Sequence, residues 1–337
     1  MKEKILGAIT GLCVGDALGV PVEFSSRKSL QFAPVTGMRG YEVYNQPPGT
    51  WSDDSSMTLC LLDSLSHGLD YADIMQRFVS WMFEGKYTPH GEVFDIGRTT
   101  KKALFRFGRE TEPLLCGGQS EHDNGNGSLM RILPLIFYLH SHYGYLWHTV
   151  DGHSEQERID EAFFDIIHNV SSLTHAHVRS NIACGIYLCV AGLLLTENLP
   201  SAIDAGVREA KKYYETKESH AKELRHFERI CGGDSVRDFA NLPQEAIQSG
   251  GYVVHTLEAA FWCLLNTDSY KSCVLEAVNL GEDTDTTAAV AGGLAGLHYG
   301  LHAIPAEWRQ QLARHEYIEN LCAAFYASLC KYGLAKK

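Results

Sequence analysis

Three carboxylates lie within four residues in the run Asn279-Leu-Gly-Glu-Asp-Thr-Asp-Thr-Thr287. They belong to Glu282, Asp283 and Asp285, and the hydroxyl of Thr286 follows directly. A helix cap needs one acid, whereas three close acids repel one another unless a cation or several N–H groups compensate them. Oxygen ligands on alternating residues suit Mg²⁺, Mn²⁺ or Ca²⁺. The run is therefore a candidate metal site, with a helix cap as the plain alternative.

A second acidic set occurs in Trp51-Ser-Asp-Asp-Ser-Ser-Met57, directly before an apolar stretch of helical period. Ser52, Asp53 and Asp54 repeat the combination of one hydroxyl and two carboxylates. Either set alone is a weak metal signal. Together they provide four aspartates at the starts of two helices, which is a ligand set for two hard divalent ions. An EF-hand is excluded, because its loop pattern is absent.

The third motif is the glycine-rich run Asn124-Gly-Asn-Gly-Ser-Leu-Met-Arg131. We expect a helix to begin near Gly127-Ser128, so that its free N–H groups and its dipole favour a phosphate or a diphosphate. The run is not a Walker loop, since the G-K-[ST] ending is missing, and no strand precedes it as in a Rossmann fingerprint. A plain Asn-Gly turn with a serine cap is the alternative.

Two further residues are ambiguous from spacing alone. His175 lies in Thr174-His-Ala-His177, but no nearby third ligand supports zinc, so a hydrogen-bonding histidine is favoured. Glu23 follows the glycine-bounded segment Gly15–Gly19, where its spacing favours a solvated side chain over a loop acid.

The elements that must position these residues are predicted to be helices almost everywhere. Ile5, Ile9 and Leu12 share one helical face, while glycines at positions 7, 11 and 15 recur on another and allow close approach of a second helix. Other helices are expected near 57–66, 95–106, 129–140, 220–231 and 286–299. We therefore predict an all-α protein built as a single many-helix domain over residues 1–337.

Composition limits the partners. The chain of 337 residues has 29 Lys and Arg against 41 Asp and Glu, a net charge of −12, and no basic run longer than two residues. This argues against nucleic acid as a partner. No window reaches the roughly 18 apolar residues of a membrane span, so no membrane association is expected. The ten cysteines form no C-x-x-C pair and are expected to be buried, reduced thiols of a cytoplasmic protein.

In this order, the motifs resemble those of the ADP-ribosylglycohydrolase family over nearly the whole chain. The matching segments are Gly15–Gly19, Trp51–Ser55, Gly125–Arg131, Thr174-His175, Ser249–Ala260 and Gly281–Gly292. The resemblance implies an all-α fold with a binuclear Mg²⁺ or Mn²⁺ centre at the bottom of a cleft.

By matching position, the resemblance implies roles for individual residues. The metal ligands would be Ser52, Asp53, Asp54, Asp283, Asp285 and Thr286. Asn126, Gly127, Ser128 and Met130 would line the diphosphate and ribose, with His175 hydrogen-bonding nearby and Tyr252 near the adenosine end. Glu23 would be an active-site acid on a mobile flap over the metals. Serines stand at positions 52 and 55, where many members have threonine.

The implied reaction is hydrolysis of the bond between ADP-ribose and a modified protein side chain, most readily arginine. Two Mg²⁺ ions, or Mn²⁺, would hold the ribose diol and a bridging water, while Asp283 and Glu23 transfer protons. The substrate could instead be serine-linked ADP-ribose, O-acetyl-ADP-ribose or another small conjugate. A protein that binds ADP-ribose without catalysis is the alternative from a different class. The family implies a monomer.

Overall fold

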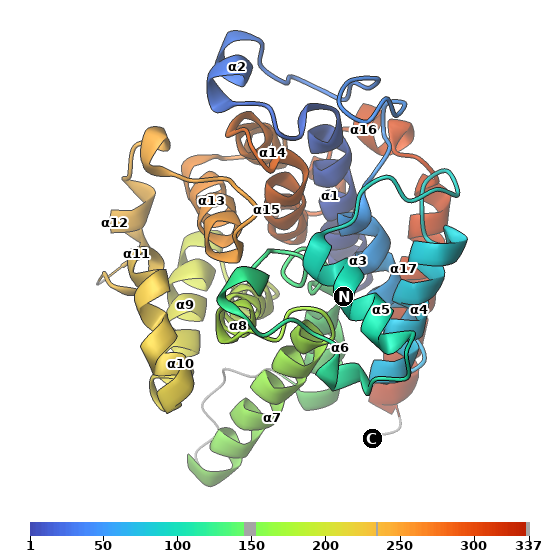
Figure 1. Ribbon diagram of the computed structural model, residues 1–337. Helices are drawn as coiled ribbons and strands as arrows, with labels where there is room; N and C mark the ends of the chain where they lie inside the picture. Colours follow the sequence, from blue (N-terminus) through green and yellow to red (C-terminus); the bar gives the residue numbers. More distant parts are fainter. Residues whose placement is uncertain (145–152, 234, 335–337) are drawn as a thin grey trace.

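The computed structural model describes residues 1–144, 153–233 and 235–334, and these residues fold almost wholly into helices (Figure 1). Over those ranges no strand forms, and the only bridges between extended residues are isolated ones joining Gly118 to His175 and Gly125 to Tyr252. The prediction of an all-α protein is confirmed.

The longer helices come from all parts of the chain. They are α1 (Lys2–Gly19), α3 (Asp53–Leu65), α4 (Tyr71–Glu84), α5 (Arg98–Phe107), α6 (Pro134–Tyr143), α7 (His153–Ser172), α8 (Val178–Leu193), α9 (Leu199–Glu215), α13 (Val253–Asn266), α14 (Tyr270–Asn279), α15 (Thr284–Tyr299) and α17 (His315–Leu334). Shorter helices are α2 (Arg27–Phe32), α10 (Glu218–Glu223), α11 (Glu228–Cys231), α12 (Val236–Ala240) and α16 (Ala306–Gln311).

Helices α1 and α15 touch through their backbones. A Cβ atom added at Gly7 would lie 2.5 Å from the carbonyl oxygen of Gly296, and one added at Gly11 would overlap the carbonyl oxygen of Gly292. The contact continues at Gly19, where an added Cβ would overlap the backbone of Asp285. Glycine spacing therefore predicted the close approach, and the structure identifies α15 as the partner (Figure 1).

Helix α1 is a core helix. Although no membrane-length apolar segment was expected, α1 is long and apolar enough to cross a membrane by length and composition alone. All of that apolar window is nevertheless buried inside the protein. Every residue from Gly7 to Gly19 is buried, so this stretch has no side that faces solvent. The one carboxylate within it is Asp16, which has no exposed surface.

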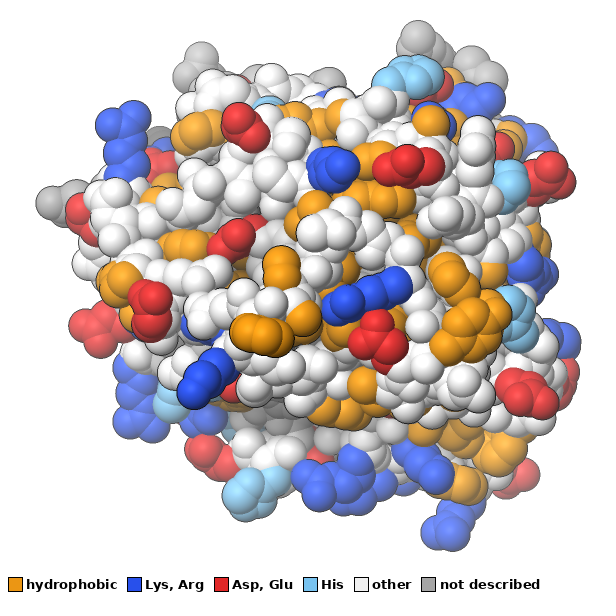
Figure 2. Space-filling view, turned by 90° about the horizontal axis from the view of Figure 1, so that it is seen from above, with side chains coloured by type: hydrophobic (Ala, Val, Ile, Leu, Met, Phe, Trp, Pro, Cys, Tyr) orange, Lys and Arg blue, Asp and Glu red, His pale blue; other side chains and the backbone are white. Residues whose placement is uncertain are grey.

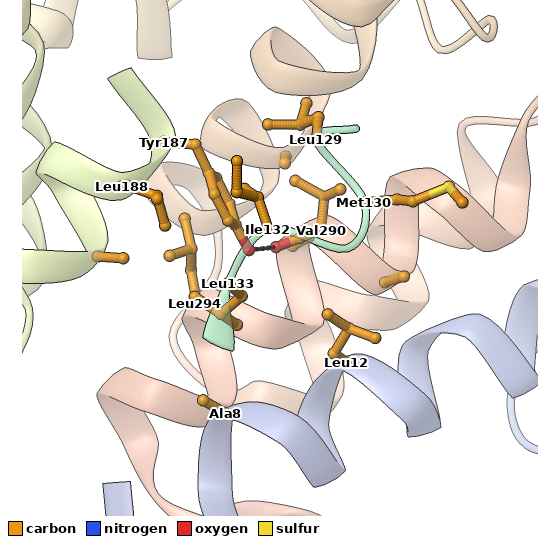
Figure 3. Close-up of a cluster of buried hydrophobic side chains, with 14 of the residues drawn as sticks. Ala8, Leu12, Leu129, Met130, Ile132, Leu133, Tyr187, Leu188, Val290 and Leu294 are labelled. Atoms are coloured by element: carbon orange, nitrogen blue, oxygen red, sulfur yellow. Dashed lines mark hydrogen bonds between the residues drawn. The ribbon is translucent and has the colours of Figure 1, made fainter. Parts of the chain in front are cut away.

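One cluster of the core lies where α1, α8 and α15 meet the segment before α6 (Figure 3). Leu12, Leu133, Tyr187, Val290 and Leu294 are all buried there. The hydroxyl of Tyr187 donates a hydrogen bond to the carbonyl oxygen of Val290 at 3.1 Å, which satisfies the only polar atom of that side chain. Helix α15, which carries Asp285, is thus held by α1 on one side and by Tyr187 of α8 on another.

All ten cysteines lie in the described residues and are free thiols, nine of them buried. Burial raises the pKa of Cys13 to about 12, so this thiol stays protonated and unreactive. The expectation of buried thiols without a disulfide framework agrees with the structure.

Two expected helices differ from the structure. The helix expected over 129–140 begins only at Pro134, because the preceding residues form successive turns, and proline suits a first helical position. The helix expected over 220–231 is broken into α10, a 3-10 turn and α11. The short helices α2 and α12 were not predicted.

The backbone contact between α1 and α15 predicts that Gly11→Ala is destabilising, although alanine is normally the better helix former. The added methyl group would overlap the carbonyl oxygen of Gly292, which belongs to a backbone that cannot rotate away. We expect the free energy of unfolding, measured by urea denaturation, to fall by about 2 kcal/mol.

Gly108→Ala is the matched control. A Cβ atom at Gly108 would come no nearer than 3.5 Å to another atom, an ordinary contact. This variant should unfold within about 0.5 kcal/mol of the original protein. Equal stability of the two variants would contradict the proposed role of the contact.

Candidate active site

Buried acids from four parts of the chain meet beside the ends of α1, α3 and α15. One group is Asp16, Asp54 and Asp285, and a second is Glu23, Asp95 and Asp285, with carboxylate oxygens within 4.8 Å of one another in each group. The structure therefore brings together three of the predicted acids and adds Asp16 and Asp95, which the sequence analysis missed.

Asp54 connects the two acidic motifs. One of its oxygens, Oδ2, accepts hydrogen bonds from Ser52 Oγ at 3.0 Å and from Thr286 Oγ1 at 3.3 Å, although Thr286 is 232 residues away in the sequence. The other oxygen, Oδ1, is buried without a hydrogen-bond partner. Burial, followed by the charge of Asp16, raises the pKa of Asp54 well above its usual range. Such an oxygen is suited to a cation.

Asp53 lies beside Asp95, in the loop before α5. Its Oδ2 accepts a hydrogen bond from the N–H of Gly97 at 3.4 Å. Burial, followed by the charge of Asp95, raises the pKa of Asp53 well above its usual range. Neighbouring carboxylates disfavour each other's charge unless a cation lies between them. Asp95 could not be singled out from the sequence, because the helix expected from residue 95 begins only at Arg98.

Glu23 is buried, with 6% of its surface exposed, so the solvated interpretation from spacing was wrong. It directly follows a 3-10 turn, Val20–Val22, that continues α1. Its Oε2 has no hydrogen-bond partner, and its carboxyl group is hydrogen-bonded to the hydroxyl of Tyr44. Burial, and then the charge of Asp95, raises the pKa of Glu23 to about 8. Glu23 therefore keeps a proton at neutral pH when no cation is bound.

Asp16 fixes the start of α3. Its Oδ1 accepts from the N–H of Ser52 at 2.9 Å, and its Oδ2 accepts from the N–H and the hydroxyl of Ser55 at 3.0 and 2.5 Å. Burial raises the pKa of Asp16 to about 6, while these hydrogen bonds act in the opposite direction. A single acid inside an apolar, glycine-spaced helix must find hydrogen-bond donors when it is buried. The isolated position of Asp16 in such a helix was the sequence signal that could have identified it.

A cavity of about 560 Å³ opens beside the acids. Glu23, Asp53, Asp95, Asp283 and Thr286 line one part of it. Five of the six predicted substrate-binding residues also line it, namely Asn126, Gly127, Met130, His175 and Tyr252. The cavity therefore joins the acidic motifs to the glycine-rich run.

Ser128 departs from its predicted position. It has no exposed surface and is not among the lining residues. Its hydroxyl is bonded instead to that of Ser171 at 2.9 Å. Residues 127–131 form turns, so the helix start predicted at Gly127-Ser128 was wrong.

Asn126 ties the glycine-rich turn to the acids. Its side-chain amide donates to Asp283 Oδ2 and to Thr256 Oγ1, both at 2.9 Å. Its backbone N–H bonds to the carbonyl oxygen of Gly251 at 3.1 Å. Tyr252 is the N-cap residue of α13 next to this bond. One side of the cavity is thus held by hydrogen bonds between three distant segments.

His175 is neutral and oriented. Burial, followed by the charge of Arg131, lowers its pKa to about 3. Its Nδ1 is bonded to Thr174 Oγ1 at 2.9 Å, and the same hydroxyl accepts from Arg131 Nη2 at 2.8 Å. Because arginine only donates, the Thr174 proton is free to point at Nδ1, which favours hydrogen on Nε2. A Cβ at Gly127 would lie 2.7 Å from the imidazole, so glycine is needed there.

Comparisons with known proteins identify the family of this chain. The sequence model of the ADP-ribosylglycohydrolase family matches residues 1–333. The chain is 32% identical to the ADP-ribosylarginine hydrolase Tri1 of Pseudomonas putida (strain GB-1), covering 96% of this chain and 78% of the relative. It is also 32% identical to the ADP-ribosyl-[dinitrogen reductase] glycohydrolase of Rhodospirillum rubrum, covering 93% and 91%.

A solved structure described as an ADP-ribosylglycohydrolase-related protein complex shares the fold, with a TM-score of 0.74 and 30% identity over 97% of this chain and 98% of that one. Together these matches define a hydrolase that acts on glycosyl bonds. The chain belongs to the ADP-ribosylglycohydrolase family.

The hydrogen bonds of Asp16 predict that Asp16→Asn lowers the affinity of the acid cluster for any divalent cation that it binds, without removing a cavity-lining residue. Asparagine cannot accept at both side-chain atoms, so the N–H of Ser52 or Ser55 loses its partner and the start of α3 shifts. Groups that orient ligands typically change metal affinity by about 10- to 100-fold. On that basis we expect a loss of about tenfold or more in Mn²⁺ affinity, measured by isothermal titration calorimetry.

Asp70→Asn is the matched control, because Asp70 caps α4 through Oδ1 alone, which accepts from the N–H groups of Ala72 and Asp73 at 2.8 and 3.2 Å, and asparagine keeps that oxygen. Asp70 is exposed and is not one of the clustered acids. This control should keep the melting temperature and the Mn²⁺ affinity of the unchanged protein, whereas Asp16→Asn should lower both. An unchanged Mn²⁺ affinity in Asp16→Asn would contradict a positioning role for Asp16.

The raised pKa of Glu23 predicts that the protein in EDTA loses stability as the pH rises. The unfolded chain ionises this group near 4.5, whereas the folded chain retains the proton to about pH 8. The folded state therefore binds more protons, and the free energy of unfolding falls by up to about 1.4 kcal/mol per pH unit for this group. The lowered pKa of His175 weakens folding only below about 6.5. Melting temperatures should thus fall between about pH 6.5 and about pH 8.5.

Glu23→Gln provides the control for this pH dependence, because glutamine does not titrate. Its melting temperature in EDTA should fall less steeply over the same range. The buried aspartates keep some of the slope, since their pKa values are raised as well. A slope identical to that of the unchanged protein would exclude Glu23 as a contributor.

Proposed function

We propose that this chain is a hydrolase that uses two divalent cations, Mg²⁺ or Mn²⁺, to release ADP-ribose from modified arginine side chains of proteins. Support for the arginine linkage comes from the relative in Pseudomonas putida, whose name states that it hydrolyses ADP-ribosylarginine. Support for a protein substrate comes from the relative in Rhodospirillum rubrum, whose name states dinitrogen reductase as its target.

The single observation that carries the proposal is the buried acid cluster with unpartnered oxygens at Asp54 and Glu23. Close, buried carboxylates destabilise a fold unless something compensates their charge. Within the described residues, no Lys or Arg forms a salt bridge with these two acids. The oxygen-only donor set suits hard divalent cations.

The residues that would hold the cations are the aspartates at positions 53, 54, 283 and 285, together with the hydroxyls of Ser52 and Thr286. Both hydroxyls already point at Asp54 Oδ2. When bound, the cations would supply the positive charge that activates a water molecule and orients the ribose hydroxyls. Serine at position 52 provides the required oxygen.

The rest of the cavity fits an ADP-ribose chain. The glycine-rich turn at Gly127 leaves its backbone accessible, and His175 presents a neutral imidazole beside it. Asn126, Met130 and Tyr252 line the same space. We assign these residues to the ribose, diphosphate and adenosine parts of the substrate, with Tyr252 at the adenosine end.

Proton transfer is assigned to Glu23 and Asp283. Glu23 is buried beside the cluster and has one unpartnered oxygen, so its carboxyl group is the candidate to donate a proton to the departing nitrogen. Asp283 is held in place by the amide of Asn126 and lines the cavity, so its carboxylate is the candidate to accept the proton of the attacking water. Both acids lie beside the cluster, as acid–base work on a glycosyl bond requires.

Hydrolysis of serine-linked ADP-ribose or O-acetyl-ADP-ribose is the nearest alternative, and binding without catalysis is the more distant one. The carboxylates needed for catalysis are all present, which favours an enzyme over a binder. We further propose that the protein works as a monomer in the cytoplasm, where its free thiols would stay reduced.

The function predicts release of ADP-ribose from ADP-ribosylated arginine in the presence of Mg²⁺, and its loss in EDTA. Substituting Asp54 and Asp283 together by alanine should lower the rate by at least about 10³-fold, because it removes two ligands and the proposed base. Release is measured by chromatography of free ADP-ribose, and circular dichroism verifies the fold.

A parallel panel of serine-linked and O-acetyl conjugates decides the linkage. Glu84→Ala is a suitable control, since this exposed acid is outside the cavity and contacts Lys86 and Ser80. Substantial ADP-ribose release by the double variant would refute the assignment of the acids. Tight ADP-ribose binding without turnover of any conjugate would favour the binder.

A further inference from the structure

Phe24 is an exposed aromatic residue beside the acidic part of the cavity. It lines the cavity next to Glu23, yet 71% of its surface is exposed. Large apolar side chains in this fold are mostly buried, and an exposed one at a cavity mouth commonly marks a contact with a ligand. On the face seen from above, hydrophobic side chains lie among scattered charges of both signs (Figure 2). Among the exposed large apolar residues, Phe24 is distinguished by lining this cavity, where its ring is available to a ligand.

The backbone holds Phe24 in an unfavourable conformation. Its φ angle is +64°, in the left-handed region that residues other than glycine rarely adopt. The N–H of Phe24 bonds to the carbonyl oxygen of Glu282 at 2.7 Å, and the N–H of Glu282 bonds to the carbonyl oxygen of Ser25 at 2.8 Å. The neighbouring Glu282 has a φ of +62° as well. These paired bonds fix the backbone that carries the ring relative to the start of α15.

An acid nearby favours a cation. Asp95, which is not assigned to the cations, lines the same cavity as the ring. A planar cation placed there would be attracted by this carboxylate and by the electron-rich face of the ring. Arg98 also lines the cavity, but it belongs to the first turn of α5, on a different segment. A guanidinium group combines the required charge with a flat shape.

We propose that Phe24 is a specificity-determining residue that packs its ring against the guanidinium of the arginine leaving group. This inference rests on the proposed function. It assigns the ring to the leaving group and leaves the ADP-ribose portion to the glycine-rich turn and His175. The ring thereby favours an arginine linkage over conjugates whose leaving group carries no planar cation.

The test compares two constants in each variant: KM for an ADP-ribosylated arginine peptide and the inhibition constant Ki of free ADP-ribose. Phe24→Leu retains an apolar side chain but loses the aromatic face, whereas Phe24→Trp retains a cation-binding face. We expect the ratio KM/Ki to rise about three- to tenfold in the leucine variant and to change less than about twofold in the tryptophan variant. Thermal unfolding and Mn²⁺ titration establish that fold and cation binding are intact.

Each result has a distinct meaning. A ratio that stays constant in the leucine variant overturns the proposal, whether both constants are unchanged or both rise together, because a joint rise places the ring on ADP-ribose. An equal rise in both variants also overturns it, since shape rather than the aromatic face would then matter. If the unchanged protein binds ADP-ribose but does not hydrolyse the arginine conjugate, the proposed function itself fails, and the role of Phe24 fails with it.

Discussion

The close contact between the backbones of α1 and α15 is the constraint on which the site depends. Glycines on both helices remove the side chains that would hold the two axes apart, so the end of α1 at Gly19 lies against Asp285. Asp16 and Asp285 therefore reach the same cluster from opposite ends of the chain. The hydroxyl of Thr284 bonds to the carbonyl oxygen of Gly19 at 2.9 Å and fixes this register. A wider helix separation would disperse the acids.

The acid cluster opposes folding locally, because it brings buried carboxylates together, and the surrounding structure tolerates this cost. Burial raises the pKa values of Asp54 and Asp285 well above the usual range, so it disfavours the charged form of both groups. Hydrogen bonds from Ser52, Ser55 and Thr286 orient the carboxylates without neutralising them. Sites of this kind are expected where function opposes stability. The rest of the core, such as the cluster around Tyr187, is apolar, and the hydroxyl of Tyr187 has a hydrogen-bond partner.

Much of the architecture could be predicted from local patterns, because helices have a period that apolar residues reveal. The starts of α15 and α3 were predicted near the acidic motifs, and Asp54 and Thr286 indeed meet. Asp16 and Asp95 were missed because each is a single acid whose partners are distant in sequence. Their roles arise only when α3 and α15 pack on α1.

The glycine-rich run shows a different limit of prediction from sequence: the segment was identified, but its conformation was not. Its residues line the cavity as expected, but the predicted helix start was wrong, because Asn126 bonds to Gly251 and Asp283 instead of capping a helix. Ser128 turns inward to Ser171 for the same reason. Composition identified the functional segment, whereas its conformation is set by tertiary hydrogen bonds between segments that local sequence does not reveal.

The burial of α1 has a consequence for biosynthesis. This apolar helix is made well before α15, the helix that covers its glycine face, which begins only at Thr284, 265 residues beyond Gly19. Until that segment leaves the ribosome, the glycine face of α1 has no native partner and stays available to chaperones or to other nascent chains. Docking of α15, a late step of assembly, also completes the acid cluster. A truncated product that lacks α15 would therefore leave the glycine face of α1 uncovered and lack the acid cluster.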